Sequence, residues 1–125
     1  DELMRQVDGV LAAGVKPERI IIDPGLGFSK PSIEHNLPLL TGLETFRGTG
    51  YPVLIGQSRK RFISAMLTEA GAVGEDGPTM AQRDDVTAAL SALSAEHGAW
   101  AVRVHDVAKS HAAVIAGNIW RQYLS

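Results

Sequence analysis

Four consecutive polar or charged residues follow a short apolar run at the centre of the chain. Residues 52–55 read as a buried strand, and residues 57–60 stand where that strand must end. The cations Arg59, Lys60 and Arg61 are adjacent and repel one another, which favours this placement if an anionic ligand neutralises them. A solvated basic turn is the alternative interpretation.

Arg103 and His105 form a second candidate anion site. They are two residues apart on an expected strand, so their side chains lie on the same face. The planar guanidinium of Arg103 beside an imidazole could bind two oxygens of a phosphate. Alternatively, Arg103 pairs with an internal carboxylate and His105 has a structural hydrogen bond.

Asp23 ends a third apolar run and could recognise a planar heterocycle. Its carboxylate only accepts hydrogen bonds and could take two from adjacent ring N–H groups. The alternative is a turn-forming Asp before Pro24. Phe28 lies in the following Gly- and Pro-rich loop, where an aromatic ring has few opportunities for core packing. Ser58 could cap a helix, bind a ligand, or do both.

The elements that must position these residues alternate between helices and strands. Helical spacing of apolar residues predicts helices over residues 1–13, 36–48, 62–67, 84–97 and 108–119, and short apolar runs predict strands over residues 19–23, 53–55 and 100–104. Asn36 is the expected N-cap of the second helix, Asp84 or Asp85 that of the fourth, and residues 68–82 are expected to be a mobile loop. Strands separated by whole helices pair in parallel and place their carboxyl ends at one edge. Either an open doubly wound sheet or part of a (β/α)₈ barrel satisfies this order.

The composition of the chain narrows the class of protein. One domain of 125 residues is expected, and a net charge of −2 gives no reason to expect nucleic acid as a partner. Cysteine is absent, which excludes disulfides and thiolate metal sites. The sequence contains no run of about 18 apolar residues, so we expect no membrane span and a cytoplasmic location. Because the sequence starts at Asp1 without a Met, we expect a piece of a longer chain.

Three motifs together resemble the dihydropteroate synthase family. They are Ile22-Asp23-Pro24-Gly25-Leu26-Gly27-Phe28-Ser29-Lys30, Gly56-Gln57-Ser58-Arg59-Lys60-Arg61-Phe62 and Val102-Arg103-Val104-His105-Asp106-Val107. They occur in the family's order and at its spacing. Residues 12–15 and 97–100 further resemble actinobacterial members.

The resemblance implies an α/β fold that is part of a (β/α)₈ TIM barrel. Residues 1–125 would form the C-terminal part of a pterin-binding domain, about the last three β/α units with a preceding helix. The family is a transferase of folate synthesis that joins p-aminobenzoate to 7,8-dihydropterin-6-ylmethyl pyrophosphate. The products are 7,8-dihydropteroate and pyrophosphate. Its members are usually homodimers.

The resemblance also implies roles for individual residues. Asp23, Gly56, Lys60 and Arg103 would bind the pterin, with Asp23 at its N–H edge. Arg103 and His105 would bind the pyrophosphate. Phe28, Ser58 and Arg59 would line the p-aminobenzoate site, which sulfonamides also occupy. No residue of the chain is expected to act as a catalytic acid, base or nucleophile.

Parts of the family's site are not found in this sequence. Mg²⁺ assists departure of pyrophosphate in the family, and its ligand, a strand-one Asn, is expected in a missing N-terminal part. We therefore expect no metal ligand in these residues and no turnover by them alone. Two alternatives stay open: the pterin-binding domain of a folate-dependent methyltransferase, and a non-catalytic fragment that binds pterin or assembles with another chain. Gln57 departs from the smaller residues common in the family at that position.

Overall fold

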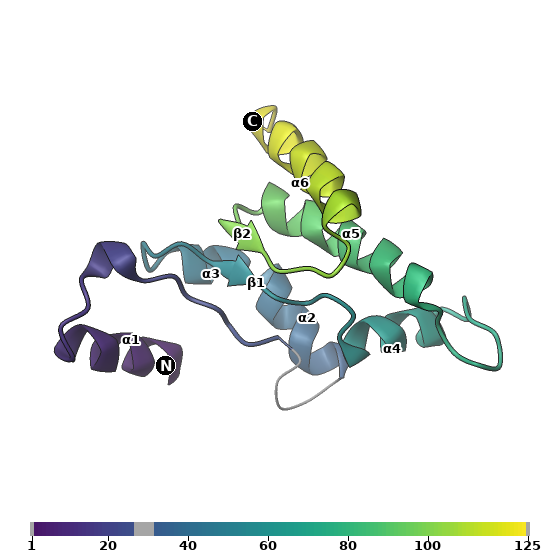
Figure 1. Cartoon of the computed structure of the whole chain (residues 1–125), viewed down its shortest axis with the longest axis horizontal. Coiled ribbons are helices and arrows are strands. Elements are labelled where there is room, and N and C mark those ends of the chain that lie inside the picture. Colours follow the sequence, from purple (N-terminus) through teal and green to yellow (C-terminus); the bar gives the residue numbers. More distant parts are fainter. Residues whose placement is uncertain (1, 27–31, 125) are drawn as a thin grey trace.

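A computed structural model describes residues 2–26 and 32–124. Helices dominate it, and a small parallel sheet lies at the centre of the molecule (Figure 1). The elements in order are α1 (Glu2–Ala12), the 3₁₀ turn η1 (Pro17–Arg19), α2 (Ile33–Thr41), α3 (Leu43–Arg47), β1 (Leu54–Ile55), α4 (Arg61–Glu69), α5 (Met80–Glu96), β2 (Ala101–Val102) and α6 (Val107–Gln122). The predicted α/β class is confirmed.

The sheet is built around β1. It pairs in parallel with β2, with Leu54 opposite Ala101, and Val53 forms a parallel bridge with Ile22 on the other side. The amide of Leu54 donates to the carbonyl of Ile22 (2.8 Å), and that of Arg103 donates to the carbonyl of Ile55 (2.9 Å). Three short parallel segments therefore end at the same edge, as the sequence predicts.

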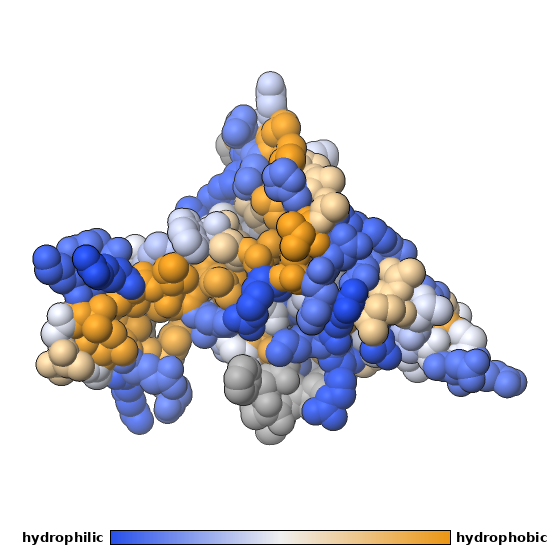
Figure 2. Space-filling view, viewed as in Figure 1, coloured by the Kyte–Doolittle hydropathy of each residue, from blue (hydrophilic) through white to orange (hydrophobic). Residues whose placement is uncertain are grey.

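Only one face of this sheet is well covered. Val53 and Ile55 point into a core shared with Leu43, Phe62 and Ile63, all at most 1% exposed. On the opposite face, Ile21 is 47% exposed, and the space-filling view shows apolar surface over the strands and along α6 (Figure 2). The strand predicted over residues 19–23 is therefore not formed: the segment makes a single bridge, at Ile22, and is buried on one side.

Two helices begin earlier than the sequence suggests. The N-cap of α2 is Ser32, whose hydroxyl accepts from the amide of His35, and Asn36 is buried inside the helix instead of capping it. The N-cap of α5 is Thr79, which forms a reciprocal capping box with Gln82. An N-cap hydroxyl with a Gln three residues later satisfies two exposed backbone N–H groups, which explains why α5 begins there and not at Asp84.

The long helices α5 and α6 pack closely side by side (Figure 1). The contact face of α6 carries the buried small residues Ser110 and Gly117, whereas Ile115 and Ile119 are about half exposed. The two half-exposed isoleucines of this helix therefore face away from α5. A Cβ atom at Gly117 would stand 2.2 Å from the carbonyl oxygen of Ala92, so only glycine permits this approach.

We therefore expect Gly117→Ala to destabilise the fold by about 1–3 kcal/mol, the usual cost of overpacking. The intrinsic preference of helices for alanine opposes this effect and does not offset it, because the obstructing atom belongs to the backbone. Urea unfolding followed by circular dichroism measures the change.

Gly9→Ala is the matched control for this prediction. Gly9 lies inside α1, and a Cβ there would meet nothing within 4 Å. The free energy of unfolding of this variant should therefore rise by up to about 1 kcal/mol. Equal effects of the two substitutions would show that the backbones of α5 and α6 are far enough apart to accept a Cβ at residue 117.

Candidate functional site

A polar cavity of about 270 Å³ opens at the carboxyl ends of β1 and β2. It is lined by Gly56, Ser58, Lys60, Arg103, Val104 and His105. The first three follow β1 and the last three follow β2, so the parallel pairing of the two strands creates the cavity. Ser58, Lys60, Arg103 and His105 therefore lie together at the carboxyl ends of the two strands, as the sequence predicts, whereas Arg59 of the same loop does not line the cavity.

Arg103 lies across the end of β1 because Gly56 leaves room for it. A Cβ at residue 56 would stand 2.4 Å from Nη2 of Arg103 and 2.9 Å from its Cζ. Nη1 of Arg103 is 3.5 Å from a carboxylate oxygen of Asp23, and both side chains are partly exposed, at 59% and 35%. Asp23, Gly56 and Arg103, all predicted to contact the pterin, therefore lie together.

Asp23 also forms the turn that was the alternative interpretation. Its Oδ1 accepts a hydrogen bond of 2.8 Å from the amide of Gly25, while Oδ2 is the oxygen nearest Arg103. Each alternative for Asp23 and Arg103 thus occurs in this structure, as a turn and an ion pair. The exposure of both groups leaves them accessible to a ligand.

Ser58 holds His105 by two contacts. The hydroxyl oxygen of Ser58 accepts from the backbone amide of His105 (3.1 Å) and lies 2.8 Å from its Nδ1. Ser58 is only 6% exposed, so this hydroxyl is largely committed to fixing the imidazole. With Nδ1 occupied, Nε2 is the ring nitrogen available to a ligand in the cavity.

Arg59 points away from the cavity and pairs with α5. Its Nε and Nη2 donate to the two carboxylate oxygens of Asp84, at 2.8 and 3.0 Å. This bidentate hydrogen bond lowers the pKa of the Asp84 carboxyl and raises that of the guanidinium. The predicted contact of Arg59 with p-aminobenzoate stays a prediction, and of the three adjacent cations only Lys60 lines the cavity.

Asp84, Thr87 and Ser91 are site-supporting residues that the sequence reasoning missed. They lie on one face of α5 and are buried, whereas the apolar Leu93 of the same helix is 56% exposed. Their spacing of three and four residues was the available signal. A polar face on a long helix is normally interpreted as solvent-exposed, because its pattern does not identify the charged loop that packs on it.

Gln57 is fully buried between the β1 loop and α5. Its Nε2 donates to Ser91 Oγ (3.4 Å), and that oxygen lies 3.3 Å from Ser110 Oγ on α6. Oε1 of Gln57 has no hydrogen-bond partner among the described residues. The amide therefore ties the loop to α5 directly and to α6 only through Ser91, and it is incompletely satisfied.

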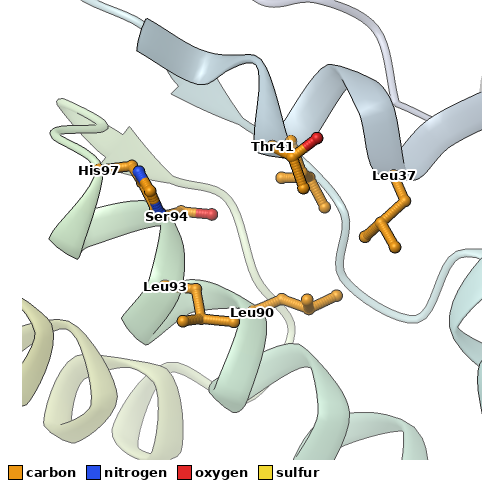
Figure 3. A pocket seen from close by; sticks show the side chains of 7 residues that line it. Leu37, Thr41, Leu90, Leu93, Ser94 and His97 are labelled. Carbon is orange, nitrogen blue, oxygen red and sulfur yellow. The ribbon is translucent and has the colours of Figure 1, made fainter.

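A second, apolar hollow lies between α2 and α5. Figure 3 shows Leu37 and Thr41 of α2 facing Leu90, Leu93 and Ser94 of α5 across it. His97 also lines it, and Nε2 of His97 lies 2.9 Å from a carboxylate oxygen of Glu96. Few polar groups converge there, so we assign it to imperfect helix packing.

Phe28, the one predicted site residue not yet placed, lies outside the described ranges, so its contact with p-aminobenzoate stays a prediction. Within residues 2–26 and 32–124, no group of three His, Asp or Glu side chains is arranged to hold a metal ion. In the same ranges, none of the helices is long and apolar enough to cross a membrane.

The pairing of Arg59 with Asp84 predicts a specific acid dependence of stability. The folded state lowers the pKa of the Asp84 carboxyl, so this group stabilises the fold at pH values above its pKa in the unfolded chain, about 3.9 for Asp. This stabilisation is lost as the pH falls through the pKa of the group in the folded state. The unfolding free energy of the parent should therefore exceed that of Asp84→Asn at pH 6, and the difference should shrink between pH 4 and pH 3. Urea unfolding across this range measures it.

Asp8→Asn, on the exposed side of α1, removes the same charge and serves as the baseline. A difference between parent and Asp84→Asn that is constant from pH 6 to pH 3 would contradict the assignment.

The family model for pterin binding enzymes matches residues 1–105. The dihydropteroate synthase of Mycobacterium leprae (strain TN) is 48% identical over 119 residues, covering 95% of this chain and 40% of the relative. That of Streptococcus pyogenes is 44% identical over 117 residues, covering 93% and 40%. The chain thus spans about 40% of the length of these relatives.

Solved structures give the same result. A dihydropteroate synthase from Coxiella burnetii in complex with pteroic acid superposes with a TM-score of 0.84 at 32% identity, covering 96% of this chain and 41% of that one. The enzyme from Anaplasma phagocytophilum with bound 6-hydroxymethylpterin-monophosphate has a TM-score of 0.80 at 33% identity, covering 94% and 42%. The chain belongs to the family of pterin binding enzymes, and the relatives it resembles are dihydropteroate synthases.

Proposed function

We propose that this chain is the C-terminal part of a dihydropteroate synthase barrel and carries part of its substrate site. The supporting observation is the cavity lined by Lys60, Arg103 and His105, with Asp23 at its edge. Two cations and an imidazole suit a pyrophosphate, and a neighbouring carboxylate suits the N–H edge of a pterin. A leaving pyrophosphate needs positive charge more than a strong base.

The opposite charges of Asp23 and Arg103 at the mouth of the cavity suit a ligand that carries N–H donors at one end and phosphate oxygens at the other. In the absence of ligand, Asp23 and Arg103 neutralise each other at 3.5 Å, a long and partly exposed contact that costs little to break. A pterin pyrophosphate would give Asp23 ring N–H donors and Arg103 phosphate oxygens. Each side chain would exchange one weak partner for a better one.

Other parts of this proposal rest on the family resemblance. These parts are the (β/α)₈ barrel, p-aminobenzoate as the second substrate, a requirement for Mg²⁺, a homodimer, a cytoplasmic location and sulfonamide binding. One relative, from Yersinia pestis, has been solved as a sulfonamide drug complex. Since the described residues hold no cluster of metal ligands, no step through Mg²⁺ is assigned to them.

A chimaeric enzyme tests the function of this chain directly. The 119 matching residues of the Mycobacterium leprae enzyme are replaced by those of this chain, and dihydropteroate formation from both substrates and Mg²⁺ is followed by chromatography. We expect turnover by the chimaera. A folded chimaera without turnover would overturn the proposal.

Within the active chimaera, Asp23→Asn and Arg103→Ala should weaken binding of the pterin pyrophosphate. Asp23→Asn leaves a ring N–H without its acceptor, and Arg103→Ala removes a charge-assisted hydrogen bond, so we expect losses of about 1–3 kcal/mol each. Calorimetry measures the affinities, with Asp8→Asn on α1 as the control. Unchanged affinity in both variants would show that the cavity is not the pterin site.

A further inference from the structure

Arg59 has an unusual backbone conformation for its residue type. Its φ is +57°, the only positive φ at a non-glycine residue in the described ranges. This left-handed region is unfavourable for side chains with a Cβ, and its occupation indicates that surrounding contacts enforce it. The residue lies between Ser58 and Lys60, which both line the polar cavity.

Helix α5 holds Arg59 at both its backbone and its side chain. The amide of Arg59 donates to Thr87 Oγ1 (3.3 Å), and the guanidinium donates twice to Asp84. The hydroxyl of Thr87 donates in turn to the carbonyl of Arg83 (2.8 Å), so its oxygen is oriented to accept. Asp84 is 8% and Thr87 2% exposed, so both acceptors are largely shielded from water.

The conformation at Arg59 determines where its two neighbours point. The chain folds tightly here, since the amide of Lys60 donates to the carbonyl of Gln57 at 3.1 Å. A change of φ at residue 59 to a negative value would rotate Ser58 relative to Lys60. The hydroxyl of Ser58 would then leave His105, which it contacts twice.

We propose that Asp84 and Thr87 are positioning residues that lock Arg59 in the left-handed conformation and thereby assemble the ligand cavity. The guanidinium of Arg59 acts through Asp84 as part of this lock and does not contact p-aminobenzoate. This inference rests on the proposed function for its consequence in catalysis, but the lock itself is a property of the chain without ligand.

The test exploits the difference between glycine and alanine at residue 59. Both Arg59→Gly and Arg59→Ala remove the guanidinium. Glycine occupies positive φ about as readily as negative φ, whereas alanine disfavours it. The readout is hydrogen exchange of the His105 amide, measured by NMR on the 125-residue chain, because this amide donates to Ser58 Oγ.

We expect exchange of the His105 amide to rise by about twofold in Arg59→Gly and by at least about fivefold in Arg59→Ala. Asp84→Ala should accelerate it severalfold in the parent, and should add little in the Arg59→Gly background. Asp85→Ala is the matched control: Asp85 is adjacent on α5, is largely exposed and pairs with Lys109, so exchange should match the parent.

Equal acceleration in Arg59→Gly and Arg59→Ala, or none in Asp84→Ala, would overturn the inference, as would a parent whose His105 amide is unprotected. The amide of Leu54, bonded within the sheet, reports whether each variant is folded. If Asp84→Ala does not fold, the comparison of the two Arg59 variants decides.

A second measurement in the chimaera separates this inference from the proposed function. If the lock matters for the site, Arg59→Gly retains more kcat/KM than Arg59→Ala. If the guanidinium binds p-aminobenzoate, both variants raise the KM for that substrate equally, which contradicts the inference. An inactive parent chimaera would count against the function alone and leave the exchange result valid.

Discussion

The parallel pairing of three short segments around β1 is the constraint on which the rest of the structure depends. Parallel strands must be connected by whole helices, and their carboxyl ends meet at one edge. Val53 to Ile55 is the central segment, bridged to Ile22 on one side and paired with β2 on the other. Residues separated by some 80 positions, such as Asp23 and Arg103, therefore come within 3.5 Å.

The loop after β1 depends on α5 as much as on the sheet. Asp84 and Thr87 hold Arg59, and Ser91 contacts Gln57, so three successive turns of one helix face act on the loop. Such a polar helix face is stable when buried only because each group has a partner. The same helix is held in turn by α6, whose Gly117 allows the two backbones to approach.

The two arginines Arg59 and Arg103 are neutralised by carboxylates to different degrees. Arg59 is neutralised by a buried carboxylate in two short hydrogen bonds, which fixes it structurally. Among the described residues, Arg103 makes one long, partly exposed contact, with Asp23, which leaves most of its N–H groups to bind a ligand. The distinction between a structural and a ligand-binding arginine follows from these geometries, because the two residues are chemically identical.

The sequence by itself determined the alternation of helices and strands and the placement of Asp23, Ser58, Lys60, Arg103 and His105 at one edge. Both follow from local apolar patterns and from the rule that parallel strands end together. The family motifs could likewise be recognised in the sequence, since they are contiguous.

Only the tertiary structure decided where individual charges point and which helix faces are buried. Local spacing could not reveal that Asp84 pairs with Arg59 and not with its own helix terminus, because the partner lies 25 residues away. Burial of Gly117 in place of Ile115 also depends on how closely α5 approaches. These features arise from contacts between elements, and a one-dimensional pattern records only the preferences within each element.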